Sequence, residues 1–155
     1  MTSGRAGRQW RRAAGGPPLT EAEARLLDRA AEARDRAYAP YSNYRVGAAV
    51  LCDDGSVHTG CNIENASYGL SVCAERVAVF NAVSAGRMEI LAVAVVAGGP
   101  GPASPCGACR QVIVEFAPDA VVLMGNDAGL VESGTAASLL PGRFVLEADG
   151  RRNST

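Results

Sequence analysis

The arrangement of apolar and polar residues predicts a helix followed by a β-hairpin in the first half of the chain. The sequence TEAE, which begins at Thr20, is a capping box in which Thr20 and Glu23 satisfy the first free amides of a helix. Apolar side chains then recur at helical spacing as far as Ala37. Two strand-like segments, VGAAVL (46–51) and SVHTGCNI (56–63), flank the turn sequence CDDG, which is typical of a hairpin.

Helical and strand-like segments alternate in the second half. Apolar residues at helical spacing begin at Cys73 and stop at Gly86, and the uninterrupted apolar run at 90–96 is typical of a strand covered on both faces. A further helix is expected from Cys106 to about residue 116, followed by a buried strand at 120–124. This alternation indicates an α/β fold, a three-layer α/β/α sandwich, in which the hairpin makes the sheet mixed.

Both ends of the chain differ in composition from the middle. Residues 1–18 are rich in Gly, Pro and Arg, and we expect a disordered basic tail there. Residues 147–155 are polar, and we expect them to be frayed. We therefore expect residues 19–146 to form a single domain, a size that suffices for one core.

Charge and cysteine content narrow the class of protein. A formal net charge of −1 gives no overall positive field that would attract nucleic acid or an anionic membrane. No apolar run reaches the roughly 18 residues of a membrane span, and no apolar segment follows the basic N-terminus as in a secretory signal peptide. The five cysteines are an odd number, and spaced cysteines in a cytosolic chain more often bind metal or catalyse than form a disulfide scaffold. We therefore expect a cytoplasmic protein with neither nucleic-acid nor membrane partners.

Three of the cysteines are spaced as metal ligands. Cys106 and Cys109 are three residues apart and share one helix face, while Cys73 begins another helix. The positive end of a helix favours thiolate over thiol, so the three sulfurs can meet at one metal ion if the helices lie side by side. Three thiolates with an open fourth position are typical of a catalytic zinc site. The only histidine, His58, and the strand cysteines, Cys52 and Cys61, are expected to be ordinary side chains of the hairpin.

Charged residues next to these cysteines suggest the chemistry. Glu75 is two residues after Cys73, and a carboxylate beside the metal, but not bound to it, can carry protons in a hydrolytic reaction. Three thiolates overcompensate the charge of zinc. Arg76 and Arg110 each adjoin the ligand region, and we expect them to return positive charge by hydrogen bonding to a thiolate.

The order and spacing of four stretches carry a family resemblance, namely YSNYRVGAAVL, TGCNIENASYGLSVCAERVAVFNAVSAG, SPCGACRQVIVEF and LLPGRF. From about Ala39 to Phe144 the chain resembles the small, homotetrameric type of cytidine deaminase, whose superfamily shares the pattern of a glutamate near one ligand and Pro-Cys-x-x-Cys. The resemblance implies a mixed five-stranded sheet, one Zn²⁺ per chain on the three cysteines, Glu75 as proton shuttle, and a homotetramer with shared active sites.

It further implies zinc-dependent hydrolytic deamination of cytidine and 2′-deoxycytidine, as in pyrimidine salvage. The substrate-binding positions that it implies are Tyr44, Asn62, Glu64, Ala66, Tyr68 and Phe144. Asn62 and Glu64 would face the ribose, and Tyr44, where the family more often has phenylalanine, would line the base pocket. Ala66, Tyr68 and Phe144 would reach the active site of a neighbouring subunit.

Other functions remain open from the sequence. A deaminase of a modified cytosine nucleoside, such as the antibiotic blasticidin S, would share the zinc motif. A structural zinc module would have closed its metal with a fourth protein ligand. Editing of single-stranded nucleic acid is disfavoured because the domain has no basic stripe with interleaved aromatic residues.

Overall fold

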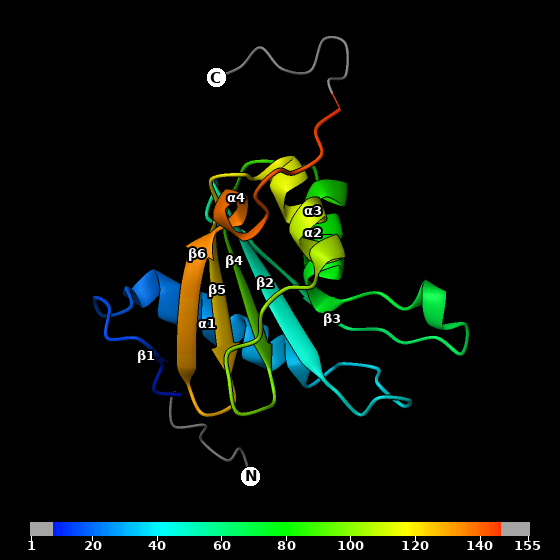
Figure 1. Cartoon of the computed structure of the whole chain (residues 1–155), viewed down its shortest axis with the longest axis horizontal. Helices are drawn as coiled ribbons and strands as arrows, with labels where there is room; N and C mark the ends of the chain where they lie inside the picture. Colours follow the sequence, from blue (N-terminus) through cyan, green and yellow to red (C-terminus); the bar gives the residue numbers. More distant parts are fainter. Residues whose placement is uncertain (1–7, 147–155) are drawn as a thin grey trace.

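The middle layer of the fold is a six-stranded mixed sheet in the order β1-β6-β5-β4-β2-β3 (Figure 1). A computed structural model describes residues 8–146 of the chain. The strands β1 and β6 pair in parallel, as do β4 and β5, and the other neighbours are antiparallel. The elements are β1 (Arg11–Arg12), α1 (Glu21–Arg34), β2 (Val46–Cys52), β3 (Val57–Cys61), the short 3-10 helix η1 (Tyr68–Leu70), α2 (Ala74–Ser84), β4 (Ile90–Ala97), α3 (Gly107–Phe116), β5 (Val121–Asn126), β6 (Leu130–Thr135) and α4 (Ala136–Leu139).

Helix α1 covers one face of the sheet. It begins at the predicted capping box, where the Thr20 hydroxyl accepts from the Glu23 amide and the Glu23 carboxylate accepts from the Thr20 amide. Its buried side chains, with Leu27 fully enclosed, pack on apolar residues from β2, β4, β5 and β6. Gly47 on β2 lets the helix approach closely, because a Cβ there would meet the backbone of Ala30 and Arg34 at less than 3.0 Å.

Helices α2 and α3 lie side by side on the opposite face, which confirms the predicted α/β/α sandwich (Figure 1). A second core fills this layer with residues from both helices and from β2, β4 and β5. Gly60 on β3 lies directly under α2, where a Cβ would meet Ala78 N at 2.5 Å and Ala74 O at 2.7 Å. This close approach fixes the beginning of α2 against the end of the hairpin.

The expected count of five strands was wrong, because β1 adds a sixth at the β6 edge. Arg11 and Arg12 pair with Leu130 and Val131, within a segment for which we expected disorder. The indole Nε1 of Trp10 donates to the Asp28 carboxylate at 2.8 Å and ties this segment to α1. The first seven residues of the expected basic tail, which include Arg5, and the expected frayed tail at 147–155 lie outside the described residues.

No helix among residues 8–146 is both long and apolar enough to cross a membrane.

Candidate active site

The sheet and the two helices on one face bring the three predicted ligand cysteines together. Cys73 is the N-cap residue of α2, Cys106 is the N-cap residue of α3, and Cys109 lies in the first turn of α3. Their sulfur atoms lie within 4.8 Å of one another, and the sulfurs of Cys73 and Cys106 are 3.9 Å apart. All three are free thiols. The chain thus presents three sulfur ligands at the positive ends of two helices.

The acid–base behaviour of the thiols fits a cationic partner. In the metal-free chain, hydrogen bonds from the Cys109 thiol and the Arg76 guanidinium lower the pKa of Cys73 to about 5, although burial acts in the opposite direction. The pKa of Cys109 is raised, because its thiol donates to Cys73 and because it is buried. The Cys73 thiolate therefore accepts a hydrogen bond from the Cys109 thiol, which keeps its own proton. A soft divalent ion such as Zn²⁺ would let all three sulfurs ionise, so this set of donors suits zinc.

Glu75 lies beside this cluster and is almost completely enclosed, at 4% exposed. It is the second residue of α2 and lines the same cavity as Cys73 and Cys106. Burial is the main cause that raises the pKa of its carboxyl group, and the nearby Cys73 adds to the rise. A buried carboxyl group with a raised pKa is suited to accept and donate protons near neutral pH.

The two arginines predicted to contact thiolates differ in their placement. Arg76 donates from Nη2 to the Cys73 sulfur at 3.4 Å, and its buried Nε atom has no hydrogen-bond partner among the described residues. The guanidinium of Arg110 instead donates to Pro105 O, Leu139 O and Ser104 Oγ. Arg110 therefore donates to two backbone carbonyls and a hydroxyl group, whereas we expected a hydrogen bond to a cysteine sulfur.

A cavity of about 300 Å³ opens above the cluster, at the lower end of the size range of small-molecule sites. It joins four of the predicted positions, Tyr44, Asn62, Glu64 and Glu75, with two of the cysteines. The other lining residues, which the sequence analysis did not single out, are Ser42, Val46, Ser71, Val72, Val95, Ala103 and Ser104. The serines Ser42, Ser71 and Ser104 belong to no motif of their own. The sequence indicates them only because they lie in the stretches YSNY, SVC and SPC.

Asn62 and Glu64 hold the loop before β2 as well as lining the cavity. The Asn62 side chain accepts from Val46 N at 2.8 Å and donates to Tyr44 O at 2.8 Å. The Glu64 carboxylate accepts from the amides of Tyr41 and Ser42 and from the Ser42 hydroxyl, which lowers its pKa. Asn62 thus holds Tyr44 directly, whereas Glu64 holds Tyr41 and Ser42, and the Ser42 hydroxyl accepts from the Tyr44 backbone amide at 3.0 Å. The pKa of Tyr44 is raised by burial and by Glu75.

Ala66, Tyr68 and Phe144 do not line the cavity of their own chain. Tyr68 is 75% exposed on the arm between β3 and α2, where its ring meets the edge of Tyr41 at a centroid distance of 5.9 Å. Phe144 is 71% exposed, and its carbonyl accepts from the Gln111 amide at 3.2 Å.

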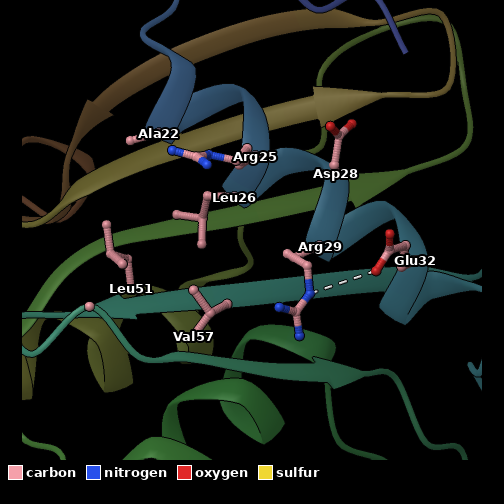
Figure 2. A pocket seen from close by; sticks show the side chains of 9 residues that line it. Ala22, Arg25, Leu26, Asp28, Arg29, Glu32, Leu51 and Val57 are labelled. Atoms are coloured by element: carbon pink, nitrogen blue, oxygen red, sulfur yellow. Dashed lines mark ion pairs between the residues drawn. The ribbon is translucent and has the colours of Figure 1, made fainter. Parts of the chain in front are cut away.

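A larger cavity of about 430 Å³ lies between α1 and the β2–β3 hairpin (Figure 2). Leu26, Leu51 and Val57 contribute its apolar lining, and the charged side chains that line it all come from α1. Arg29 pairs with Glu32 at 3.6 Å, so these charges neutralise one another on a solvated helix face. This cavity has no cysteine in its lining, and the candidate active site is therefore the smaller one.

The fold and the cysteine cluster indicate the general class of protein. A cluster of three cysteines, two of which line a small cavity together with a buried carboxylate, supplies the components of a metal-dependent enzyme that moves protons on a small molecule.

Comparison with known proteins then identifies the family. Residues 20–125 match the family model described as the cytidine and deoxycytidylate deaminase zinc-binding region. The chain belongs to this family.

Individual relatives agree with this assignment. A cytidine deaminase of Halalkalibacterium halodurans is 54% identical over 123 residues, which cover 79% of this chain and 93% of that protein. A cytidine deaminase of Sporosarcina psychrophila is 51% identical over 124 residues, which cover 79% of this chain and 91% of that protein. The crystal structure of a cytidine deaminase from Burkholderia pseudomallei superposes with a TM-score of 0.77 at 50% identity, covering 81% of this chain and 100% of that one.

Proposed function

We propose that the chain catalyses hydrolytic deamination of cytidine and 2′-deoxycytidine to uridine and 2′-deoxyuridine, with release of ammonia. The observation that carries this proposal is the buried Glu75, which lines one cavity with Cys73 and Cys106 of the three-cysteine cluster. Two relatives that are more than half identical to the chain are named cytidine deaminase, and each is covered over more than nine tenths of its length.

Zinc bound by the three cysteines would act as a Lewis acid that makes water nucleophilic at neutral pH. Glu75 accepts a proton from the attacking water and delivers it to N3 of the pyrimidine, which prepares C4 for attack. The water oxygen then forms a bond to C4, and Glu75 accepts the second proton of this water from the new C4 hydroxyl and passes it to the amine. The C4–N bond breaks as the C4 carbonyl forms, so ammonia leaves and N3 keeps its proton. The enclosed position of Glu75 keeps bulk water from competing for these transfers.

The remaining cavity residues orient the nucleoside. Tyr44 offers an aromatic face to the base, and Asn62 and Glu64 lie on the sugar side. Three hydrogen bonds already reach the Glu64 carboxylate, whose oxygens have about four acceptor sites, so one site is left for a sugar hydroxyl. The alternative of a modified cytosine nucleoside is not favoured, because both of these relatives are named cytidine deaminase.

Ammonia release from a panel of substrates tests this function. Zinc-loaded protein should deaminate cytidine and 2′-deoxycytidine, while cytidine 5′-monophosphate, free cytosine and blasticidin S should react far more slowly. The monophosphate would bring nearly two negative charges close to Glu64, in a cavity whose lining contains no arginine. Comparable kcat/KM values for cytidine and its monophosphate would contradict the pocket assignment, and no reaction with either nucleoside would contradict the function.

We further propose a homotetramer in which neighbouring subunits complete each active site. The exposure of Tyr68 and Phe144, two aromatic side chains outside their own cavity, supports this arrangement. Two inactive variants, Glu75→Gln and Phe144→Ala, should regain activity when they are mixed and reassembled, because some sites then combine two intact contributions. Active protein with the mass of one chain in light scattering, or no gain of activity on mixing, would contradict shared sites.

A cytoplasmic location is likewise our proposal. The five cysteines are all free thiols, which suits a reducing compartment.

A further inference from the structure

The guanidinium group of Arg110 connects helix α3 to the end of the loop before it and to the end of α4. Its Nε donates to Pro105 O at 2.8 Å, its Nη1 to Leu139 O at 2.8 Å, and its Nη2 to Ser104 Oγ at 2.7 Å. These bonds use donors on all three nitrogens of a rigid planar group, at short distances and in a partly buried position. A flexible lysine ammonium cannot reach the same three acceptors in this geometry.

Two of these bonds hold a wall of the catalytic cavity. The loop between β4 and α3 has the sequence GGPGPASP, and its last part, Ala103 and Ser104, lines the cavity beside Cys106. Gly99 O accepts from Asn126 at 3.3 Å, and Ala103 N donates to Gly125 O at 3.2 Å. Arg110 then fixes the last two residues before Cys106. The position of this wall relative to the metal ligands therefore depends on Arg110.

The third bond connects the same residue to the C-terminal segment. Leu139 is the last residue of α4, where helix carbonyls lack partners within the helix. The next residue on α3, Gln111, donates to Phe144 O. Adjacent residues of the metal-bearing helix thus hold both ends of residues 139–144.

We propose that Arg110 is a positioning residue of the active site, which sets the Ser104 wall of the substrate cavity against the cysteine cluster and anchors the start of the Phe144 segment. This inference rests on the proposed deaminase function for its kinetic consequence. Its structural part, that Arg110 holds Ser104 and Pro105 in the segment 98–105 and Leu139 in the segment 139–144, stands on the hydrogen bonds alone.

Three variants and one control test the proposal. Arg110→Gln removes the charge and the planar fork, Arg110→Lys keeps the charge, and Ser104→Ala removes only one of the three bonds. Arg29→Gln is the control, because Arg29 makes an exposed ion pair on α1 next to the other cavity. Each protein is measured for zinc content, for steady-state kinetics with cytidine, and for amide hydrogen exchange in the zinc-loaded form.

We expect Arg110→Gln to keep one zinc per chain and to raise KM for cytidine by about 10-fold or more, with a smaller change in kcat. Exchange should accelerate in residues 98–105 and 139–144, whereas Arg29→Gln should match the wild type. Arg110→Lys should recover only part of the loss, and Ser104→Ala should raise KM less than Arg110→Gln does.

Unchanged exchange in both segments, or an unchanged KM with reduced thermal stability alone, would overturn the proposal. Loss of zinc from Arg110→Gln would also overturn it, since Arg110 would then act on metal retention. If Arg110→Gln does not fold, Arg110→Lys and Ser104→Ala decide the question by the same measurements. If the wild type does not deaminate cytidine, the deaminase function fails, and hydrogen exchange alone still decides whether Arg110 orders the wall.

Discussion

Replacing Glu75 by Gln should separate catalysis from stability. The glutamine has nearly the shape of the carboxylate and fits the same enclosed position, so the fold and the cysteine cluster are kept. The variant cannot accept the proton of the attacking water. A positioned acid–base group contributes about 10²- to 10⁴-fold to a rate, which corresponds to about 3–5 kcal/mol of the activation barrier. Because Glu75 serves more than one proton transfer in our proposal, we expect a loss at the upper end of this range.

The free energy of unfolding of metal-free Glu75→Gln should not fall, although its activity does. Burial raises the pKa of Glu75 in the folded chain, so the folded state binds this proton more tightly than the unfolded state does. The contribution of this carboxyl group to stability is therefore full below the unfolded-state pKa of about 4.3, falls as pH rises towards the raised folded-state pKa, and is constant above that pKa. Glutamine carries no such charge, and metal-free Glu75→Gln should be at least as stable as the wild type at pH 7.

Two measurements on the same preparations check this reasoning. Single-turnover deamination of cytidine reports the chemical step, and urea unfolding of the metal-free proteins reports the free energy of unfolding. Near-normal turnover by Glu75→Gln, at full zinc content, would remove Glu75 from the mechanism. A clear loss of stability at pH 7, without loss at pH 4, would contradict the assignment of its raised pKa to burial.

Three further substitutions test the fold and the sugar side. Gly60→Ala should destabilise the protein by about 1–3 kcal/mol in urea unfolding and weaken zinc retention, since a Cβ there collides with the backbone of α2. The control variant Gly69→Ala, which has open space around it, should not change the free energy of unfolding. Trp10→Ala should lower the free energy of unfolding by about 1–3 kcal/mol and leave kcat unchanged, because it removes the bond to Asp28; an unchanged melting temperature would contradict this role. Glu64→Gln should reduce kcat/KM for cytidine about 10- to 100-fold and barely affect free cytosine, and an equal loss on both would show that Glu64 does not read the sugar.

Much of the fold follows from local patterns that the sequence displays directly. The capping box at Thr20, the hairpin about Gly55 and the buried strand at β4 all depend on neighbouring residues, and the structure has them at the predicted places. The meeting of Cys73 with the other two cysteines could be anticipated if the two helices lie side by side, and they do so because α2 follows β3 and α3 follows β4, two strands of the same direction that are both antiparallel to β2.

The elements that the sequence analysis missed depend on contacts between distant residues. The strand β1 has only two residues, and it is held by pairing with β6 and by Trp10 against α1. Its Arg-Arg sequence carries no strand pattern, so composition suggested a tail. The strand β6, LVESGT, lies between β5 and the two-residue β1, and its exposed positions are mostly polar, so it lacks the apolar run of β4 or β5.

The difference between local patterns and contacts of distant residues also applies to the active site. Arg110 adjoins Cys109 in sequence, and proximity suggested a bond to sulfur, but the helix directs its side chain to Ser104 and Leu139. The partners of Glu64 lie more than twenty residues earlier, in a loop whose path no local pattern specifies. Local chemistry therefore indicated which residues form the centre, and the tertiary fold decided which residues support it.

The most direct test of the account is a zinc titration of metal-free protein with cytidine deamination as the readout. Because three thiolates of one chain form the only cysteine cluster among residues 8–146, activity should rise in proportion to added zinc and stop rising at one equivalent per chain. The variant Cys106→Ala should bind zinc weakly and remain inactive throughout the titration. Activity that does not depend on zinc, or that continues to rise to two equivalents per chain, would contradict the three-cysteine centre.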